Sequence, residues 1–157
     1  MTVTKHKAFA YITSGTTSGT TRGMRLLLLA HPNQPEAGLQ VPAGTMEPGE
    51  TPEQAVLREA REETDLEHLI LVELIGRQTY DARTWGRDEL HDRWFFHLRC
   101  EQTTAERWST TEESPSDGDE PVAFELFWVP LDQTFPALIA DHDRYVTNLI
   151  RALQNWR

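Results

Sequence analysis

The chain has 157 residues, a length that suits one domain with a single hydrophobic core. Its formal net charge of −10 argues against binding to a nucleic-acid polymer, because the phosphate backbone attracts a basic surface. The single cysteine, Cys100, excludes a disulfide within the chain and fits a cytoplasmic location, and no apolar run at the N-terminus predicts a signal peptide or a membrane span.

The first elements predict a β-hairpin with a long connection. Residues Ala8–Thr13 are expected to form a short strand. Residues Met24–His31 form a nearly unbroken apolar run, which is typical of a strand buried on both faces. The residues between them, 14–23, are mostly Ser, Thr and Gly, so we expect a flexible tip.

A helix is predicted after two turn-rich segments, Val41–Gly44 and Glu47–Glu50. Thr51 is the expected N-cap, Pro52 occupies the first helical position, and Gln54 would return a capping-box hydrogen bond. The apolar stripe that would dock this helix on a sheet consists of Ala55, Val56, Ala60 and Leu66.

Three further strands and a second helix are predicted downstream. The strands cover His68–Gln78, Glu89–Cys100 and Val122–Val129. Residues Arg77–Asp88 would connect the first two of these strands, and the polar, acidic tract Glu101–Pro121 is expected to be a long surface loop. Residues Pro136–Trp156 have the spacing of a helix. Strands with one helix in mid-chain and one at the end favour a sheet that is covered on both faces.

Three glutamates of the mid-chain helix indicate a metal site. A helix advances about 100° per residue, so Glu59, Glu62 and Glu63 fall on one narrow face. Carboxylates this close repel one another, and a purely structural helix tends to avoid such like-charged pairs. Hard oxygen ligands on a rigid helix suit Mg²⁺ or Mn²⁺. The alternative is a solvated acidic face with Arg–Glu pairs along the helix.

The segment Gly44–Leu66, GTMEPGETPEQAVLREAREETDL, resembles the signature box of the Nudix hydrolases. The positions that match are Gly44, Glu50, Arg58, Glu59, Ala60, Glu62, Glu63 and Leu66. Asp65 departs from the glycine that ends the helix in the family, at a cost of about 1 kcal/mol, because Asp tolerates the left-handed conformation. The resemblance implies one Nudix domain over residues 1–157, with an α/β/α sandwich around a mixed sheet.

The resemblance also implies roles for individual residues. The implied metal ligands are Glu59, Glu62, Glu63 and the backbone carbonyl of Ala43. Among them Glu63 would be the least replaceable. Arg58 would orient the carboxylates, which its planar fork suits better than a Lys ammonium, and Glu50 would assist from the loop side.

The implied reaction is attack by a metal-activated water on the pyrophosphate bond of a nucleoside diphosphate linked to a second group. The partner would thus be a small nucleotide, and a homodimer is among the expected assemblies because many relatives dimerise. An ADP-ribose-like compound, a dinucleoside polyphosphate and a nucleoside triphosphate all stay open as substrates. The other readings are a Nudix-fold nucleotide-binding regulatory module without turnover and a phosphatase of broad scope.

Relatives often supply a further carboxylate from a late loop as the general base. Glu120 is the first candidate, because a residue just before a strand is held more firmly than one in mid-loop. The other candidates in the same acidic tract are Glu112, Glu113, Asp117 and Asp119. The alternative for each of them is a solvated position in an acidic loop.

Two residues in the loop after the box are candidates for binding the substrate. The ring of Tyr80 could stack on a base, and the guanidinium of Arg83 could pair with a phosphate. Trp85 and Arg87 lie in the same loop and could make the same kinds of contact. Local packing is the alternative reading for these side chains.

Overall fold

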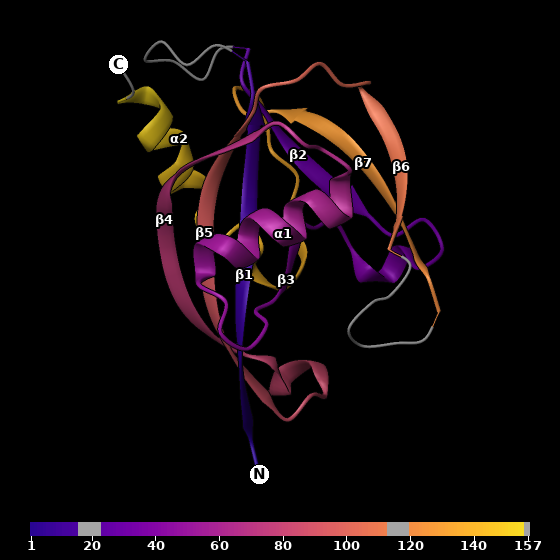
Figure 1. The fold of residues 1–157 in the computed structure, drawn as a ribbon, viewed down its shortest axis with the longest axis vertical. Coiled ribbons are helices and arrows are strands. Elements are labelled where there is room, and N and C mark those ends of the chain that lie inside the picture. The colour runs from indigo at the N-terminus through magenta and orange to yellow at the C-terminus, as the bar shows by residue number, and fades with distance from the viewer. Residues whose placement is uncertain (16–22, 113–119, 156–157) are drawn as a thin grey trace.

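The computed structural model describes residues 1–15, 23–112 and 120–155 (Figure 1). Most of the predicted flexible tip between the first two strands, residues 16–22, lies outside this description. Three of the candidate bases, Glu113, Asp117 and Asp119, lie outside it as well.

Seven strands form one mixed sheet. They are β1 (Val3–Ser14), β2 (Arg25–Ala30), β3 (Ala43–Thr45), β4 (Leu69–Asp81), β5 (Glu89–Cys100), β6 (Arg107–Glu112) and β7 (Val122–Pro130). The order across the sheet is β4-β5-β1-β2-β7-β6, and β3 pairs with β1. Strands β1 and β5 run parallel, whereas the other pairs of described strands are antiparallel. The predicted mixed sheet is confirmed.

Two α-helices cover the sheet, α1 (Pro52–Thr64) and α2 (Val146–Gln154), and three short 3₁₀ turns connect elements: η1 (Pro35–Ala37), η2 (Ala82–Trp85) and η3 (Ile139–Asp141). Successive residues of a strand point to opposite faces, and β1 divides its side chains between two cores in this way. Ala8 and Ala10 pack with α1, while Phe9 and Tyr11 pack with α2. The architecture is therefore the predicted α/β/α sandwich.

The start and end of α1 agree with the sequence analysis. The Thr51 hydroxyl accepts a hydrogen bond from the Gln54 backbone N–H at 3.1 Å, and the Gln54 side chain accepts one from the Thr51 N–H at 3.0 Å. At the other end, Asp65 adopts the left-handed conformation with φ 60° and ψ 15°. The cap and the docked apolar stripe together fix the direction in which the glutamates of α1 point.

The acidic tract Glu101–Pro121 was expected to be a loop, and this prediction is wrong for β6. This strand pairs with β7 over its whole length. Its polar residues are used inside the protein: the Trp108 indole N–H donates to the Thr64 carbonyl at 2.9 Å, and the Thr110 hydroxyl donates to the Glu63 carbonyl at 2.5 Å. A strand that docks on a helix end through hydrogen bonds has no apolar alternation to reveal it.

Other boundaries differ from expectation for physical reasons. Within the predicted helix Pro136–Trp156, the described residues are α-helical only over α2. Ala140 and Asp141 have φ of 50° and 61°, and these positive values are incompatible with an α-helix before Val146. The predicted connection Arg77–Asp88 begins too early, since β4 stays paired with β5 as far as Asp81.

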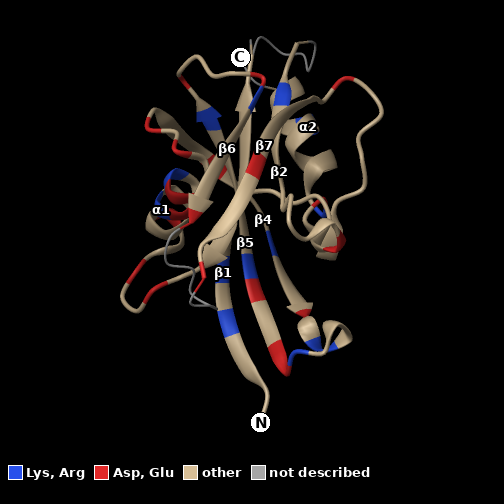
Figure 2. Ribbon diagram, turned by 90° about the vertical axis from the view of Figure 1, so that its right-hand side faces the viewer, with Lys and Arg blue, Asp and Glu red and all other residues tan. Residues whose placement is uncertain are grey.

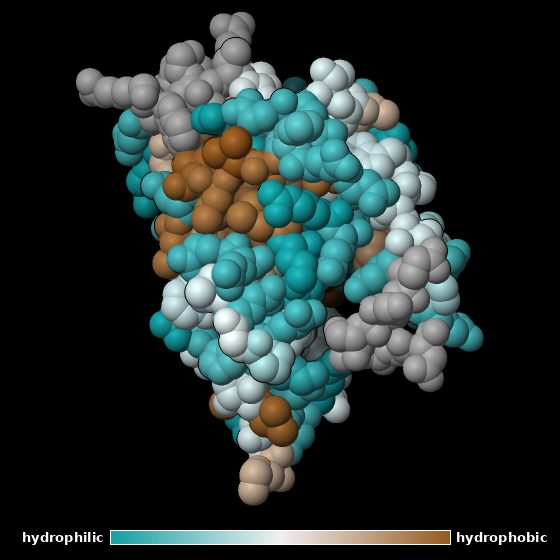
Figure 3. Space-filling view, viewed as in Figure 1, coloured by the Kyte–Doolittle hydropathy of each residue, from teal (hydrophilic) through white to brown (hydrophobic). Residues whose placement is uncertain are grey.

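On the side of the molecule that carries α1, a large apolar area lies beside the helix where β4 passes it (Figure 3). Leu57 of α1 and Leu71 of β4 are partly buried against the core, and Leu74 is 45% exposed. The short helix thus covers its face of the sheet incompletely. None of the helices in the described part of the chain has the length and apolar character that a membrane crossing requires.

Replacing Asp65 with glycine is expected to raise the free energy of unfolding by about 1 kcal/mol, because glycine adopts positive φ without steric cost. For a chain of this size the melting temperature should rise by about 2–4 °C in a thermal denaturation followed by circular dichroism. Asp65→Ala is the matched control and should melt below the wild type, since alanine is strained at this position. A glycine variant that melts no higher than the wild type would contradict this account of the helix end.

Candidate active site

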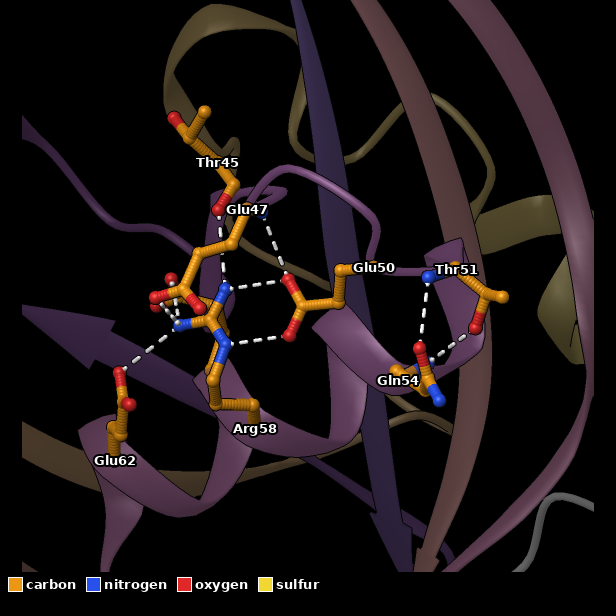
Figure 4. A network of polar contacts seen from close by, with 8 residues as sticks. Thr45, Glu47, Glu50, Thr51, Gln54, Arg58 and Glu62 are labelled. Carbon is orange, nitrogen blue, oxygen red and sulfur yellow. Dashed lines mark hydrogen bonds and ion pairs between the residues drawn. The ribbon is translucent and has the colours of Figure 1, made fainter.

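Arg58, in the middle of α1, is the centre of a polar network that joins the helix to the loop before it and to β3 (Figure 4). Its Nε and Nη2 atoms donate to both carboxylate oxygens of Glu50, at 2.7 and 2.9 Å. Its Nη1 donates to Glu59 at 2.9 Å and to Glu62 at 3.3 Å, and Nη2 also donates to the Thr45 carbonyl at 3.2 Å. One guanidinium therefore links the loop, β3 and two carboxylates of the helix.

The carboxylates in this network differ in charge state. Hydrogen bonding to Arg58 lowers the pKa of Glu50 to about 2, so Glu50 stays ionised and anchors the guanidinium. Burial raises the pKa of Glu59 to about 7, although the hydrogen bond from Arg58 acts in the opposite direction. Burial, and then the charge of Glu59, raises the pKa of Glu63 well above its usual value. Glu59 and Glu63 are therefore two buried carboxylates whose negative charge is not fully balanced by the described basic side chains.

Strand β3 lies directly beneath these carboxylates. The Ala43 backbone N–H donates to Glu63 Oε1 at 2.8 Å. A Cβ atom at Gly44 would lie 2.0 Å from the Glu59 carboxyl carbon, so a side chain at this position would displace Glu59. The box glycine is therefore required for close approach of helix and strand. The acidic face of α1 turns toward β3, with Glu59 and Glu63 only 9% and 8% exposed.

Glu112, the last residue of β6, completes the acidic group. One carboxylate oxygen each from Glu59, Glu62 and Glu112 lies within 4.8 Å of the others. Repulsion from Glu112 also contributes to the raised pKa values of Glu59 and Glu63. Clustered carboxylate oxygens with unbalanced charge are the donor set that Mg²⁺ or Mn²⁺ prefers, so these residues fit such an ion.

The acidic group borders a cleft of about 320 Å³. Of the residues predicted to form the site, Ala43, Glu59 and Glu63 line this cleft, together with Glu112. The remaining lining comes from several strands and loops, and consists of Lys7, His31, Gln34, Gln40, Gly44, Thr45, Arg87, Val122 and Phe124. Residues distant in sequence thus meet at one cleft beside β3 and α1.

Three predicted site residues lie elsewhere. Glu120 is exposed and lines an adjoining pocket of about 260 Å³. Tyr80 stacks under Arg93, whose guanidinium carbon lies 3.8 Å from the ring centroid, and its hydroxyl accepts a hydrogen bond from Trp85. Arg83 forms an ion pair with Asp81 at 2.7 Å. Contact of these residues with a substrate stays a prediction.

The basic residues of the cleft do not follow from any pattern in the sequence. Arg87 lies in the same loop as the predicted Arg83, and no motif marks Lys7. Lys7 reaches the site because β1 pairs with β3, which places Lys7 opposite Thr45. Such a position follows from strand register, and only the charge of Lys7 in a basic N-terminal segment could have drawn attention to it.

Comparison with known proteins identifies the family. The family model described as the NUDIX domain matches residues 9–150. The chain therefore belongs to the Nudix family, as the signature box predicts. No curated protein sequence gives a significant match.

Solved structures share the fold at low identity. The C. elegans Ap4A hydrolase, in a binary complex, has a TM-score of 0.57 and 18% identity, over 96% of this chain and 93% of its own. The NUDIX domain of Shewanella oneidensis NrtR, complexed with ADP ribose, has a TM-score of 0.59 and 16% identity, over 98% and 90%. A UDP-X diphosphatase has a TM-score of 0.57 and 17% identity, and this chain covers 62% of its length.

Gly44→Ala is expected to weaken binding of Mn²⁺ by at least about tenfold, because the new methyl group occupies the place of the Glu59 carboxylate. Isothermal titration calorimetry with Mn²⁺ measures the affinity, and circular dichroism checks that the variant is folded. Affinity equal to that of the wild type in a folded variant would show that Glu59 is not a ligand.

The raised pKa values predict how stability depends on pH. Glu59 and Glu63 hold their protons more tightly in the folded chain than in the unfolded chain, so their contribution to stability is complete below about pH 4.5. For Glu59 it is lost as the pH rises through about 7, and for Glu63 it is lost as the pH rises through its own raised pKa. A bound divalent ion favours the ionised carboxylates, so Mg²⁺ should raise the melting temperature more at pH 8 than at pH 5. Thermal denaturation at both pH values, with and without Mg²⁺, measures this difference, and an equal effect at both would contradict it.

Proposed function

We propose that the chain hydrolyses a pyrophosphate bond in a nucleoside diphosphate linked to another moiety, with Mg²⁺ or Mn²⁺ as cofactor. The observation that carries this proposal is the meeting of Glu59, Glu62 and Glu112 within 4.8 Å beside a cleft. A cleft of about 320 Å³ falls in the size range of small-molecule sites. Divalent cations would neutralise both the acidic group and the phosphates of a bound nucleotide.

The chain's own residues would divide the work as follows. Glu59, Glu62 and Glu63 would be metal ligands, together with the backbone carbonyl of Ala43. A divalent ion, when bound, would lower the pKa of a coordinated water and offset negative charge on the phosphates. Arg58 would hold the carboxylates in position through its bonds to Glu50, Glu59 and Glu62.

The proton acceptor would be a late carboxylate. The water oxygen bonds to phosphorus, the bond from phosphorus to the bridging oxygen breaks, and the proton of the water passes to this carboxylate. Glu112 is favoured, because one of its oxygens lies within 4.8 Å of those of Glu59 and Glu62. Glu120, the first candidate from the sequence, borders the adjoining pocket instead.

The names of the structural neighbours support a nucleotide substrate. One is described as an Ap4A hydrolase, one as a UDP-X diphosphatase, and one is complexed with ADP ribose. A panel of ADP-ribose, dinucleoside polyphosphates, nucleoside triphosphates and nucleotide sugars, each assayed with Mg²⁺, tests the proposal. Nucleotide binding without turnover of any of them would favour a binding module and overturn the proposed activity.

Glu63→Gln is expected to lower kcat by about 10²-fold or more, because the buried carboxylate beside the Ala43 N–H loses its charge. Glu112→Gln should have a similar effect, while Glu120→Gln should change kcat less than tenfold. Glu53→Gln, an exposed change in the first turn of the same helix, is the matched control and should leave kcat unchanged. Steady-state kinetics with the best substrate of the panel gives all four values, and activity of Glu63→Gln near that of the control would refute the assignment.

A further inference from the structure

The cleft has two ends that differ in their side chains. One end lies near β2 and β7 and the other near β1 and β5, as the order of the strands in the sheet requires. At the end formed by β2 and β7, the cleft shares His31, Gln34 and Val122 with the adjoining pocket that contains Glu120. At the end formed by β1 and β5, it is lined by Lys7 of β1 and by Arg87, which comes just before β5. Glu59 and Glu112 of the acidic group line the same cleft, so a substrate whose phosphates meet these carboxylates could extend toward either end.

The end near β2 and β7 suits a nucleoside. Its pocket of about 260 Å³ combines the side-chain amides of Asn33 and Gln34 with the apolar surface of Pro121, Val122 and Ala123. Amides match the donors and acceptors on the edge of a base, and apolar atoms match its faces. A phosphate chain would meet the exposed carboxylate of Glu120 there, which would repel it.

The end near β1 and β5 suits an anion. Figure 2 shows basic residues on β1 and beside the turn that joins β4 and β5, with acidic residues of β5 between them, at the end of the sheet nearest the N-terminus. Lysine occurs only at positions 5 and 7 of this acidic chain, and Lys7 is the one that lines the cleft. An uncharged sugar at this end would gain little from two cations, whereas phosphate oxygens accept charge-assisted hydrogen bonds from both.

We infer that Lys7 and Arg87 bind phosphates beyond the scissile bond, and that the substrate is a nucleoside carrying three or more phosphates. Both a nucleoside triphosphate and a dinucleoside polyphosphate have this chemistry. ADP-ribose and nucleotide sugars place an uncharged sugar where the two cations lie. The inference rests on the proposed hydrolase function and selects among its substrates.

The test compares kcat/KM for ATP, diadenosine tetraphosphate and ADP-ribose in the wild type and in Lys7→Gln and Arg87→Gln. Each substitution should lower kcat/KM for the polyphosphates by about tenfold or more and should change that for ADP-ribose less than threefold. Lys7→Arg keeps the charge and should retain most of the polyphosphate activity. The ratio of kcat/KM for ATP to that for diadenosine tetraphosphate in the wild type shows whether the substrate is a nucleoside triphosphate or a dinucleoside polyphosphate.

Lys5→Gln is the matched control, because Lys5 lies on the same strand but is not among the residues that line the cleft. It should leave all three values unchanged. Arg83→Gln tests the competing prediction from the sequence, and a larger loss there than in Arg87→Gln would overturn the assignment of Arg87. Equal losses for ADP-ribose and the polyphosphates, or a wild type that prefers ADP-ribose, would overturn the inference.

A wild type that turns over no substrate refutes the proposed function, and the inference is then decided by binding. Isothermal titration calorimetry with ATP and ADP-ribose should give tighter binding of ATP, and Lys7→Gln and Arg87→Gln should reduce that difference. Equal affinities for the two nucleotides in the wild type would overturn the inference separately from the activity. Circular dichroism of every variant confirms that it is folded.

Discussion

The site depends on one arginine that holds several carboxylates in a small space. Arg58 contacts Glu50 with two parallel hydrogen bonds and reaches Glu59 and Glu62 with its remaining nitrogen. Glu50 has its charge matched in this way, so the guanidinium is fixed before any other cation arrives. Glu59 and Glu63 keep raised pKa values despite it, which leaves an acidic centre that is partly dehydrated and short of positive charge. Carboxylate oxygens in such a centre are the donor type that Mg²⁺ and Mn²⁺ prefer.

Two short strands, β3 and β6, bring the other groups of the site to α1. Strand β3 has only three residues, yet it supplies the N–H that Glu63 accepts and the glycine that lets Glu59 approach. Strand β6 docks on the end of α1 through Trp108 and Thr110 and so carries Glu112 to the other carboxylates. Polar contacts, more than apolar burial, set the position of the late carboxylate.

The sheet gives the cleft a direction. Parallel pairing of β1 with β5 places basic residues at one end, while β2 and β7 bring amides and an apolar surface to the other. The carboxylates belong to this same cleft, so charge changes sign along it. Members of one family can therefore carry the same carboxylates on the equivalent of α1 and still differ in substrate, because the loops and strand ends that line the cleft differ.

The sequence by itself determined the helix, its caps, the three glutamates and the arginine, because these interactions are between residues at most a few turns apart and depend on helical spacing. It also determined the mixed sandwich and the family, through apolar periodicity and the box. Only the tertiary structure decided that Glu112 joins the acidic group while Glu120 does not, and that Arg87 lines the cleft while Arg83 pairs with Asp81. Which of these residues reach the site depends on strand register and on β6, a polar strand without apolar alternation. Both bring together residues more than 40 positions apart, such as Glu63 and Thr110.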